Sequence, residues 1–317
     1  MTATLWFLLS LVLLALGGDS IVKGIGGLGR RLGWPPFATG LVLIALATSI
    51  PELVVNFHAV AAGQSALALG NAVGSNVLNV GLTLALAAVA APLVVRWRAL
   101  SPLLMVLLAS TLLVILMSLD GQLSVIDGAI LVIGFIAVMA WRIVRCDEES
   151  PEVRAEIEGF TARVDSMGAS VLRIAVAAVA LGIGAWLLVR HAPAMGRSLG
   201  FSPLLTGLLP VAIGTALPEL AGGIGAARRG QGDLVAGHVI GSSLVNILLV
   251  LGGMALIGHG VAMPGSFVRY ELPAALAFAV MLLPVLRGDM RVSRNEGVVL
   301  FIALLLWLAF EALQLHR

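Results

Sequence analysis

Long apolar runs, bounded by turn-forming or charged residues, follow one another along the whole chain. Ten of them are long enough to cross a bilayer, and they lie at residues 4–28, 36–62, 66–91, 100–119, 124–144, 169–192, 203–228, 232–257, 268–286 and 296–314. A helix needs about 20 apolar residues to span the hydrocarbon core. The short connectors hold turn residues such as Gly63 and the Asp120–Gly121 pair. The pattern therefore predicts an all-α membrane protein with ten transmembrane helices.

One longer polar segment, residues 145–168, separates five apolar runs from five. This spacing predicts a first five-helix unit at residues 1–144, a linker at 145–168 that faces the cytoplasm, and a second five-helix unit at 169–317.

The two units repeat each other at a constant offset of 167 residues, without a gap. Residues 40–52 read GLVLIALATSIPE and residues 207–219 read GLLPVAIGTALPE; residues 70–81 read GNAVGSNVLNVG and residues 237–248 read GHVIGSSLVNIL. Because each unit has an odd number of spans, the second enters the membrane from the opposite side. Inverted repeats of this kind place a substrate site near the midplane, where the two halves meet. The repeat favours a transporter.

Composition agrees with a membrane protein and narrows the partners. Hydrophobic residues make up 60% of the chain and charged residues 11%, with a mean hydropathy of +1.07. Soluble domains carry about 25% charged residues, so the composition excludes a protein whose whole surface faces water. Cys146 is the only cysteine, which leaves no internal disulfide and no thiol-rich metal site. Basic residues form no clustered face, so we expect no nucleic-acid partner.

The basic residues indicate an orientation. Of the 19 Lys and Arg residues, 15 lie in or beside loops on one side of the predicted membrane, and only Arg190, Arg197, Arg269 and Arg317 lie on the other. Positive charge is retained on the cytoplasmic side. We therefore expect a multi-pass protein of the bacterial inner membrane, with both termini external and the linker inside.

Glu52 and Glu219 are acidic residues near the centres of the second and seventh runs, at equivalent positions of the repeat. A carboxylate at mid-bilayer is costly and is functional by default, although a protonated structural Glu is the alternative. Each follows a proline, which removes an N–H and is expected to open the helix one turn earlier. Thr48 and Thr215 precede the two carboxylates by four residues and share their helix faces. Carboxylates, hydroxyls and loosened carbonyls are the oxygen ligands that Ca²⁺ prefers.

Polar stripes at helical spacing mark the third and eighth runs. Their members are Asn71, Ser75 and Asn79 in the first repeat and His238, Ser242 and Asn246 in the second. Such a stripe is often interhelical glue, and glycines at four-residue spacing beside it allow close helix contact. Beside two buried carboxylates, ion coordination is the favoured interpretation.

These motifs resemble those of the cation/calcium exchanger superfamily. The similar segments are T-S-x-P-E and G-N-x-x-G-S-N-x-x-N in the first repeat, and T-x-x-P-E and G-x-x-x-G-S in the second; the resemblance covers essentially all ten runs. It implies that Glu52 and Glu219 bind Ca²⁺ together with the backbone carbonyls of Thr48 and Thr215. It also implies flanking sodium sites formed by Ser49, Ser75, Asn79, Ser242 and Asn246. No cofactor is implied beyond the transported ions.

Three positions depart from that pattern. Asn246 stands where sodium-coupled members commonly have Asp, Ala216 stands in place of a Ser, and His238 stands in place of the Asn of the G-N pair. The site then offers two formal negative charges, which balance one Ca²⁺, two Na⁺ or two H⁺. His238 would favour proton coupling if it titrates, although a neutral hydrogen-bonded His is the preferred interpretation.

The predicted function is secondary antiport of Ca²⁺ against Na⁺ by alternating access, with Ca²⁺/H⁺ antiport as the alternative. A passive cation channel would use rings of ligands from identical subunits, whereas this repeat lies within one chain and is inverted. An intramembrane enzyme has less support, because the sequence contains neither H-E-x-x-H nor G-x-S-x-G with partners. The sequence leaves the oligomeric state open.

Overall fold

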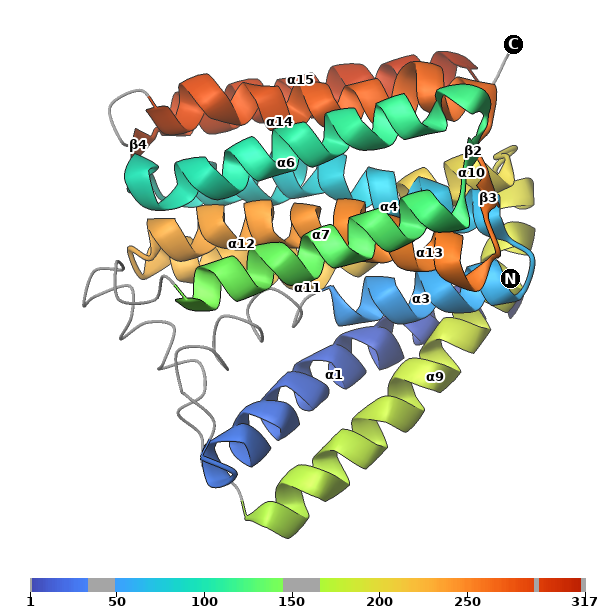
Figure 1. Ribbon diagram of the computed structural model, residues 1–317, viewed down its shortest axis with the longest axis horizontal. Coiled ribbons are helices and arrows are strands. Elements are labelled where there is room, and N and C mark those ends of the chain that lie inside the picture. Colours follow the sequence, from blue (N-terminus) through green and yellow to red (C-terminus); the bar gives the residue numbers. More distant parts are fainter. Residues whose placement is uncertain (1, 34–48, 145–165, 288–290, 315–317) are drawn as a thin grey trace.

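The computed structural model describes residues 2–33, 49–144, 166–287 and 291–314 (Figure 1). Within these ranges nine apolar helices are long enough to cross a membrane, and each coincides with a predicted run. The second run is described only from Ile50 to Ala61. The predicted all-α architecture is confirmed, with helix ends displaced by a few residues.

The described part of the first repeat contains four full spans and the last part of the second span, and the third span is a composite. Its elements are α1 (Thr2–Arg31), α3 (Ile50–Ala61), the continuous run α4 (Ser65–Leu78), η1 (Asn79–Leu84) and α5 (Ala85–Ala90), then α6 (Trp97–Met117), the turn η2 (Ser118–Asp120) and α7 (Val125–Val144).

The second repeat follows the same order. Its elements are α9 (Met167–Ser198), the run α10 (Pro203–Thr206), η4 (Gly207–Val211) and α11 (Ala212–Arg228), the run α12 (Gly232–Leu244), η5 (Val245–Val250) and α13 (Leu251–Ile257), then η6 (Phe267–Glu271) with α14 (Leu272–Arg287), and α15 (Arg294–Gln314).

The third and eighth spans form the core of the bundle. Their apolar windows are 83% and 78% buried, against 17% for α7. These two spans carry the small and polar residues of the repeat motifs, which pack against other helices, whereas the Leu- and Ile-rich spans face lipid. The helices of the core therefore bring the motif residues together, away from the membrane.

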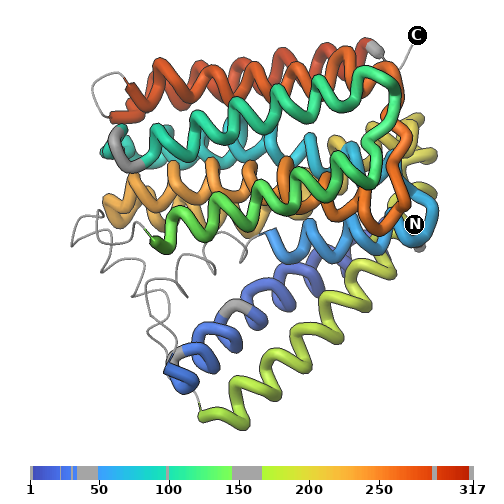
Figure 2. The backbone as a smooth tube through the Cα atoms, in the orientation of Figure 1, coloured from blue at the N-terminus to red at the C-terminus, as the bar shows by residue number. Residues whose placement is uncertain are grey.

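Helices α1 and α9, the first spans of the two repeats, form a separate pair that runs obliquely to the other helices (Figures 1 and 2). Glycines permit this contact: a Cβ at Gly17 would lie 2.8 Å from Leu181, and one at Gly184 would lie 3.0 Å from Leu14. The pair joins equivalent elements of the repeats, as a two-fold relation requires.

Two short antiparallel ribbons join loops of different repeats. Strand β1 (Leu93–Val94) pairs with β4 (Arg291–Val292), and β2 (Gln122–Leu123) pairs with β3 (Val261–Ala262). Each ribbon joins a loop of the first repeat to a loop of the second. Exchanging the two repeats therefore converts one ribbon into the other. The ribbons lie at opposite ends of the bundle, and α1 begins and α15 ends at the β2–β3 end (Figure 1). Successive spans that cross the bundle in opposite directions place the loops at alternate ends in this way.

A contact at the repeat axis supports the same symmetry. The side-chain amide of Asn76 donates to the backbone carbonyl of Ser243 at 3.4 Å, and these residues are equivalent at the 167-residue offset. Equivalent residues touch each other only where a two-fold axis passes between them. The inverted five-helix repeat predicted from the sequence is thus present in the fold.

Candidate cation-binding site

Both predicted carboxylates lie in the protein interior. Glu52 is 1% exposed in the first turn of α3, and Glu219 is 4% exposed in the middle of α11. Helices α3, α4, α11 and α12 surround them, together with the π-helical segments η1 and η5. A site made from these side chains draws on both repeats.

The two Pro-Glu pairs differ in backbone structure. Helix α3 begins at Ile50, directly before Pro51, and residues 34–48 lie outside the described ranges. Helix α11 continues as a regular α-helix through Pro218, so the expected opening there is wrong. The irregular stretch is η4, two to three turns before Pro218, which contains Pro210. Pro218 removes one N–H without ending the helix.

Wide turns mark equivalent places in the third and eighth spans. Segment η1 begins at Asn79, and η5 begins at Val245, next to Asn246. Both segments have π-helical geometry, which is rare and occurs often at functional sites. A π-helical turn contains one more residue than an α-helical turn, so the side chains that follow it are rotated about the helix axis. The rotation begins at the last residue of each polar stripe.

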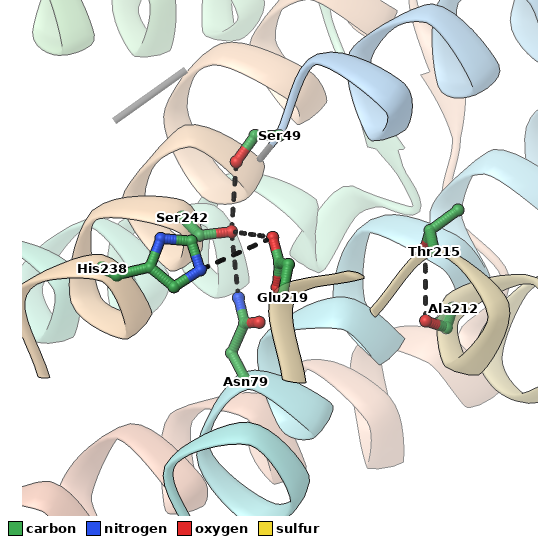
Figure 3. A network of polar contacts seen from close by, with 7 residues as sticks. All are labelled: Ser49, Asn79, Ala212, Thr215, Glu219, His238 and Ser242. Atoms are coloured by element: carbon green, nitrogen blue, oxygen red, sulfur yellow. Dashed lines mark hydrogen bonds and ion pairs between the residues drawn. The ribbon is translucent and has the colours of Figure 1, made fainter. Parts of the chain in front are cut away.

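The hydroxyl of Ser242 is the centre of a hydrogen-bond network that links four helices (Figure 3). It lies 3.1 Å from Ser49 Oγ, 3.1 Å from Asn79 Nδ2 and 3.2 Å from Glu219 Oε1. A serine hydroxyl has one proton and two lone pairs. Ser49 and Asn79 therefore donate to Ser242, and Ser242 donates to the carboxylate of Glu219.

Thr215 belongs to the neighbourhood of Glu52. Its hydroxyl donates to the carbonyl of Ala212 at 3.2 Å, and its side chain also interacts with the Glu52 carboxylate. Glu52 lies within electrostatic range of Glu219. The two carboxylates are therefore neighbours contributed by different repeats. Thr48 lies outside the described residues.

Several buried oxygens on these helices have no hydrogen-bond partner among the described residues. They include Glu52 Oε2, Ser75 Oγ, Asn79 Oδ1 and Asn246 Oδ1. A buried polar atom left unsatisfied costs roughly 1–3 kcal/mol, more if charged. Oxygen atoms are the ligands that hard cations prefer. The residues present thus fit Ca²⁺ or Na⁺ as a transported substrate.

Within the described ranges, no three His, Cys, Asp or Glu side chains are placed so that they could hold a metal ion by themselves. Because Ca²⁺ takes six to eight oxygens, a site here must add hydroxyl, amide and backbone oxygens to its two carboxylates. Asn246 is 0% exposed and brings no charge where an acid would.

Asn71 serves a different purpose from the other stripe residues. Its amide donates to Asn56 Oδ1 at 3.0 Å and so joins α4 to α3. The interhelical-glue interpretation applies to this member of the stripe. Sequence reasoning missed Asn56, which is 0% exposed; an amide in a membrane span was the signal available.

His238 approaches the same carboxylate as Ser242. Its Nε2 atom lies 3.9 Å from Glu219 Oε1, and its side chain is 12% exposed (Figure 3). A titratable base beside a site carboxylate is a feature that a proton-coupled transporter would use.

The closeness of the third and seventh spans depends on glycine. A Cβ at Gly70 would lie 2.1 Å from the carbonyl oxygen of Leu204, and one at Gly74 would lie 2.5 Å from that of Leu208. The predicted small-residue contact is confirmed for these two. Gly237 would meet Leu100 at 3.6 Å, and Gly241 meets nothing described within 4 Å.

Comparison with known proteins finds similarity over both repeats that carry these motifs. A family model described as sodium/calcium exchanger protein matches residues 2–144 and 169–313. The chain is 32% identical to the inner membrane protein YrbG of Escherichia coli (strain K12), over 97% of this chain and 96% of that protein. It is 27% identical to the sodium/calcium exchanger MaX1 of Methanosarcina acetivorans, over 92% and 93%.

Solved structures of the sodium-calcium exchanger NCX_Mj share the fold. One, soaked with 2.5 mM Na⁺ and 0.1 mM Ca²⁺, matches with a TM-score of 0.66 and 27% identity, over 98% of both chains. Another, soaked without either ion, matches with a TM-score of 0.64.

Proposed function

Since this chain belongs to the sodium/calcium exchanger protein family, we propose that it is an antiporter that exchanges Ca²⁺ for Na⁺ across the inner membrane by alternating access. The observation that carries the proposal is the pair of buried carboxylates, Glu52 and Glu219, which come from the two inverted repeats and lie within electrostatic range of each other. A charged group inside a membrane protein marks an ion path by default.

In this proposal Glu52 and Glu219 bind Ca²⁺, and the backbone carbonyls of Thr48 and Thr215 complete the site. The polar residues around them form the flanking sodium sites: Ser49, Ser75, Asn79, Ser242 and Asn246. The network at Ser242 joins three of these residues to one carboxylate. Ions that occupy shared oxygens exclude each other, which is what exchange requires.

Alternating access needs a site that both faces can reach in turn. The candidate ligands lie on both repeats, so movement of one repeat against the other changes which side is open. A channel would instead hold one continuous path through rings of ligands. We place both termini outside and residues 145–168 inside.

The test is calcium flux into proteoliposomes under an imposed Na⁺ gradient and, separately, under a pH gradient. Glu52→Gln and Glu219→Gln should each abolish uptake while the purified proteins elute and melt as folded monodisperse samples. Asp120→Asn is the matched control, because this acid lies in the exposed turn η2, where it accepts from the Gln122 N–H. Wild-type flux in either Gln variant would exclude that carboxylate from the site.

Proton coupling is the second candidate, and the contact of His238 with Glu219 favours it. Uptake driven by the pH gradient and indifferent to Na⁺ would establish Ca²⁺/H⁺ exchange. In that case His238→Gln should reduce pH-driven uptake. If Na⁺ alone drives transport, the same variant should retain it.

A further inference from the structure

Two further carboxylates are buried within membrane spans, away from the candidate site. Glu271 lies in η6, at the start of the ninth span, and is 5% exposed; Glu311 lies in α15, near the end of the tenth, and is 4% exposed. Both acids lie near the ends of their spans, unlike Glu52 and Glu219, which lie near the centres of theirs. Acids near the ends of apolar runs look like interfacial residues, and only packing shows otherwise.

The segments that carry Glu271 and Glu311 contact each other. The residues that precede them, Tyr270 and Phe310, pack edge to face with ring centroids 5.6 Å apart, which fixes this part of η6 against α15. Glu311 lies within electrostatic range of Glu271. One oxygen of each, Glu271 Oε2 and Glu311 Oε1, has no hydrogen-bond partner among the described residues.

The elements packed around the pair bring no counter-charge. Helices α4 and α5 and segment η1 contain no titratable side chain. The other charged or titratable residues of these elements are Arg98 on α6, Arg287 on α14, Arg291 on β4, and Arg294 and Glu296 on α15.

Those residues lie at the end of the bundle that is far from Glu271 and Glu311. At 1.5 Å per residue, Arg287 is about 24 Å along the helix from Glu271, and Glu296 about 22 Å from Glu311. Arg269 and Tyr270 neighbour Glu271 in sequence but are exposed. Within the described ranges, no basic side chain forms an ion pair with either acid.

The chemistry of the pair limits what it can bind. Two ionised carboxylates side by side in a buried place repel each other, and one of them then holds a proton. A calcium ion needs six to eight oxygens, and among the described residues no third His, Cys, Asp or Glu joins the two acids. The other buried polar atom nearby on α15, Trp307 Nε1, is a donor and not a ligand.

We propose that Glu271 and Glu311 form a proton-binding carboxyl pair between the ninth and the tenth spans. A proton on either group removes most of the repulsion between the two. The pair is separate from the transport site and does not depend on the function proposed for it.

The carboxyl pair lies on helices that support the candidate site. A Cβ at Gly81, in η1, would lie 2.8 Å from Phe278 of α14 and 2.8 Å from Leu304 of α15. These contacts are seven residues, about 10 Å, from the two acids. Loss of the proton would push apart the two helices that hold η1, the segment that begins at Asn79.

The test is the pH dependence of thermal unfolding in detergent, at constant Na⁺ and without Ca²⁺. The parent protein carries Glu52→Gln and Glu219→Gln, so that titration of the transport site does not contribute. Because the folded pair holds a proton that the unfolded chain releases, stability must fall as pH rises. For one proton the unfolding constant rises up to about tenfold per pH unit.

Adding Glu271→Gln or Glu311→Gln should remove this dependence, since a neutral amide replaces one acid. Glu296→Gln is the matched control on α15. The Glu296 carboxylate accepts from the Ser293 N–H at 2.8 Å, and the pH dependence of unfolding should persist in this variant. Infrared absorption of a protonated carboxyl group, present in the parent at neutral pH and lost in either variant, is a second readout that needs no unfolding.

Either of two results overturns the proposal. The first is an unchanged pH dependence and an unchanged carboxyl band in both Gln variants. The second is stabilisation of the parent by Ca²⁺ or Na⁺ that Glu271→Gln removes, which would make the pair a metal site.

Discussion

A methyl group at Gly70 should force apart the spans that carry the two halves of the site. In Gly70→Ala the new Cβ would lie 2.1 Å from the Leu204 carbonyl oxygen and 2.8 Å from the Leu208 nitrogen. From the other helix, a Cβ at Gly207 would lie 2.0 Å from the Leu67 carbonyl oxygen. The contact is backbone against backbone, so no side chain can rotate away.

The magnitude follows from these distances. A carbon–oxygen contact is comfortable at about 3.3 Å, so α4 and α10 must separate by roughly 1 Å at this point. Overpacking costs about 1–3 kcal/mol, and the immovable backbone places this case near the upper figure. Replacing a helical glycine by alanine recovers about 1 kcal/mol. We expect a net destabilisation of about 2 kcal/mol.

Gly182→Ala is the matched control. Gly182 lies within α9, and its Cβ would meet nothing described within 4 Å. It should gain the helical preference of alanine, about 1 kcal/mol, without strain. The two variants then differ by about 3 kcal/mol, which is roughly 6–12 °C in melting temperature.

The assay is thermal unfolding of both variants in detergent, followed by calcium flux in proteoliposomes. Gly70→Ala should melt well below Gly182→Ala and should transport poorly, because Ser75 and Asn79 lie on the displaced span. Gly207→Ala should behave like Gly70→Ala. Equal melting temperatures for Gly70→Ala and Gly182→Ala would refute the close backbone crossing.

Three other predictions concern topology, charge and the hydrogen-bond network. In a Cys146→Ser background, Ser150→Cys should react with an impermeant thiol reagent only after cells are permeabilised, because residues 145–168 are placed inside; labelling of intact cells would reverse the topology. Exchange should be electroneutral or nearly so, because two carboxylates balance one Ca²⁺ or two monovalent ions and a net charge in a low-dielectric site is expensive; a steep dependence of flux on clamped voltage would contradict this, and Asn246→Asp should change the voltage response. Ser242→Ala should lower stability by roughly 2–4 kcal/mol, because it leaves the Ser49 and Asn79 donors unsatisfied; an unchanged melting temperature would show that these donors find other acceptors.

The sequence by itself determined the solvent, the number of spans and the inverted repeat. Apolar runs of bilayer length need no knowledge of their neighbours, since a helix satisfies its own backbone hydrogen bonds within the segment. The 167-residue offset is likewise a property of the chain alone. Glu52 and Glu219 were identifiable for the same reason: a charge in the middle of an apolar run is conspicuous before any contact is known.

Only the tertiary structure decided which polar groups meet. Ser242 joins residues from four helices that are up to 193 positions apart, and Asn71 pairs with Asn56, not with the carboxylates. Glu271 and Glu311 became a buried pair through the packing of η6 against α15. These contacts depend on how each helix is rotated and how closely it crosses its neighbours. Hydrophobic periodicity carries little of that information in a membrane, where apolar residues cover both the lipid-facing and the buried sides of a span.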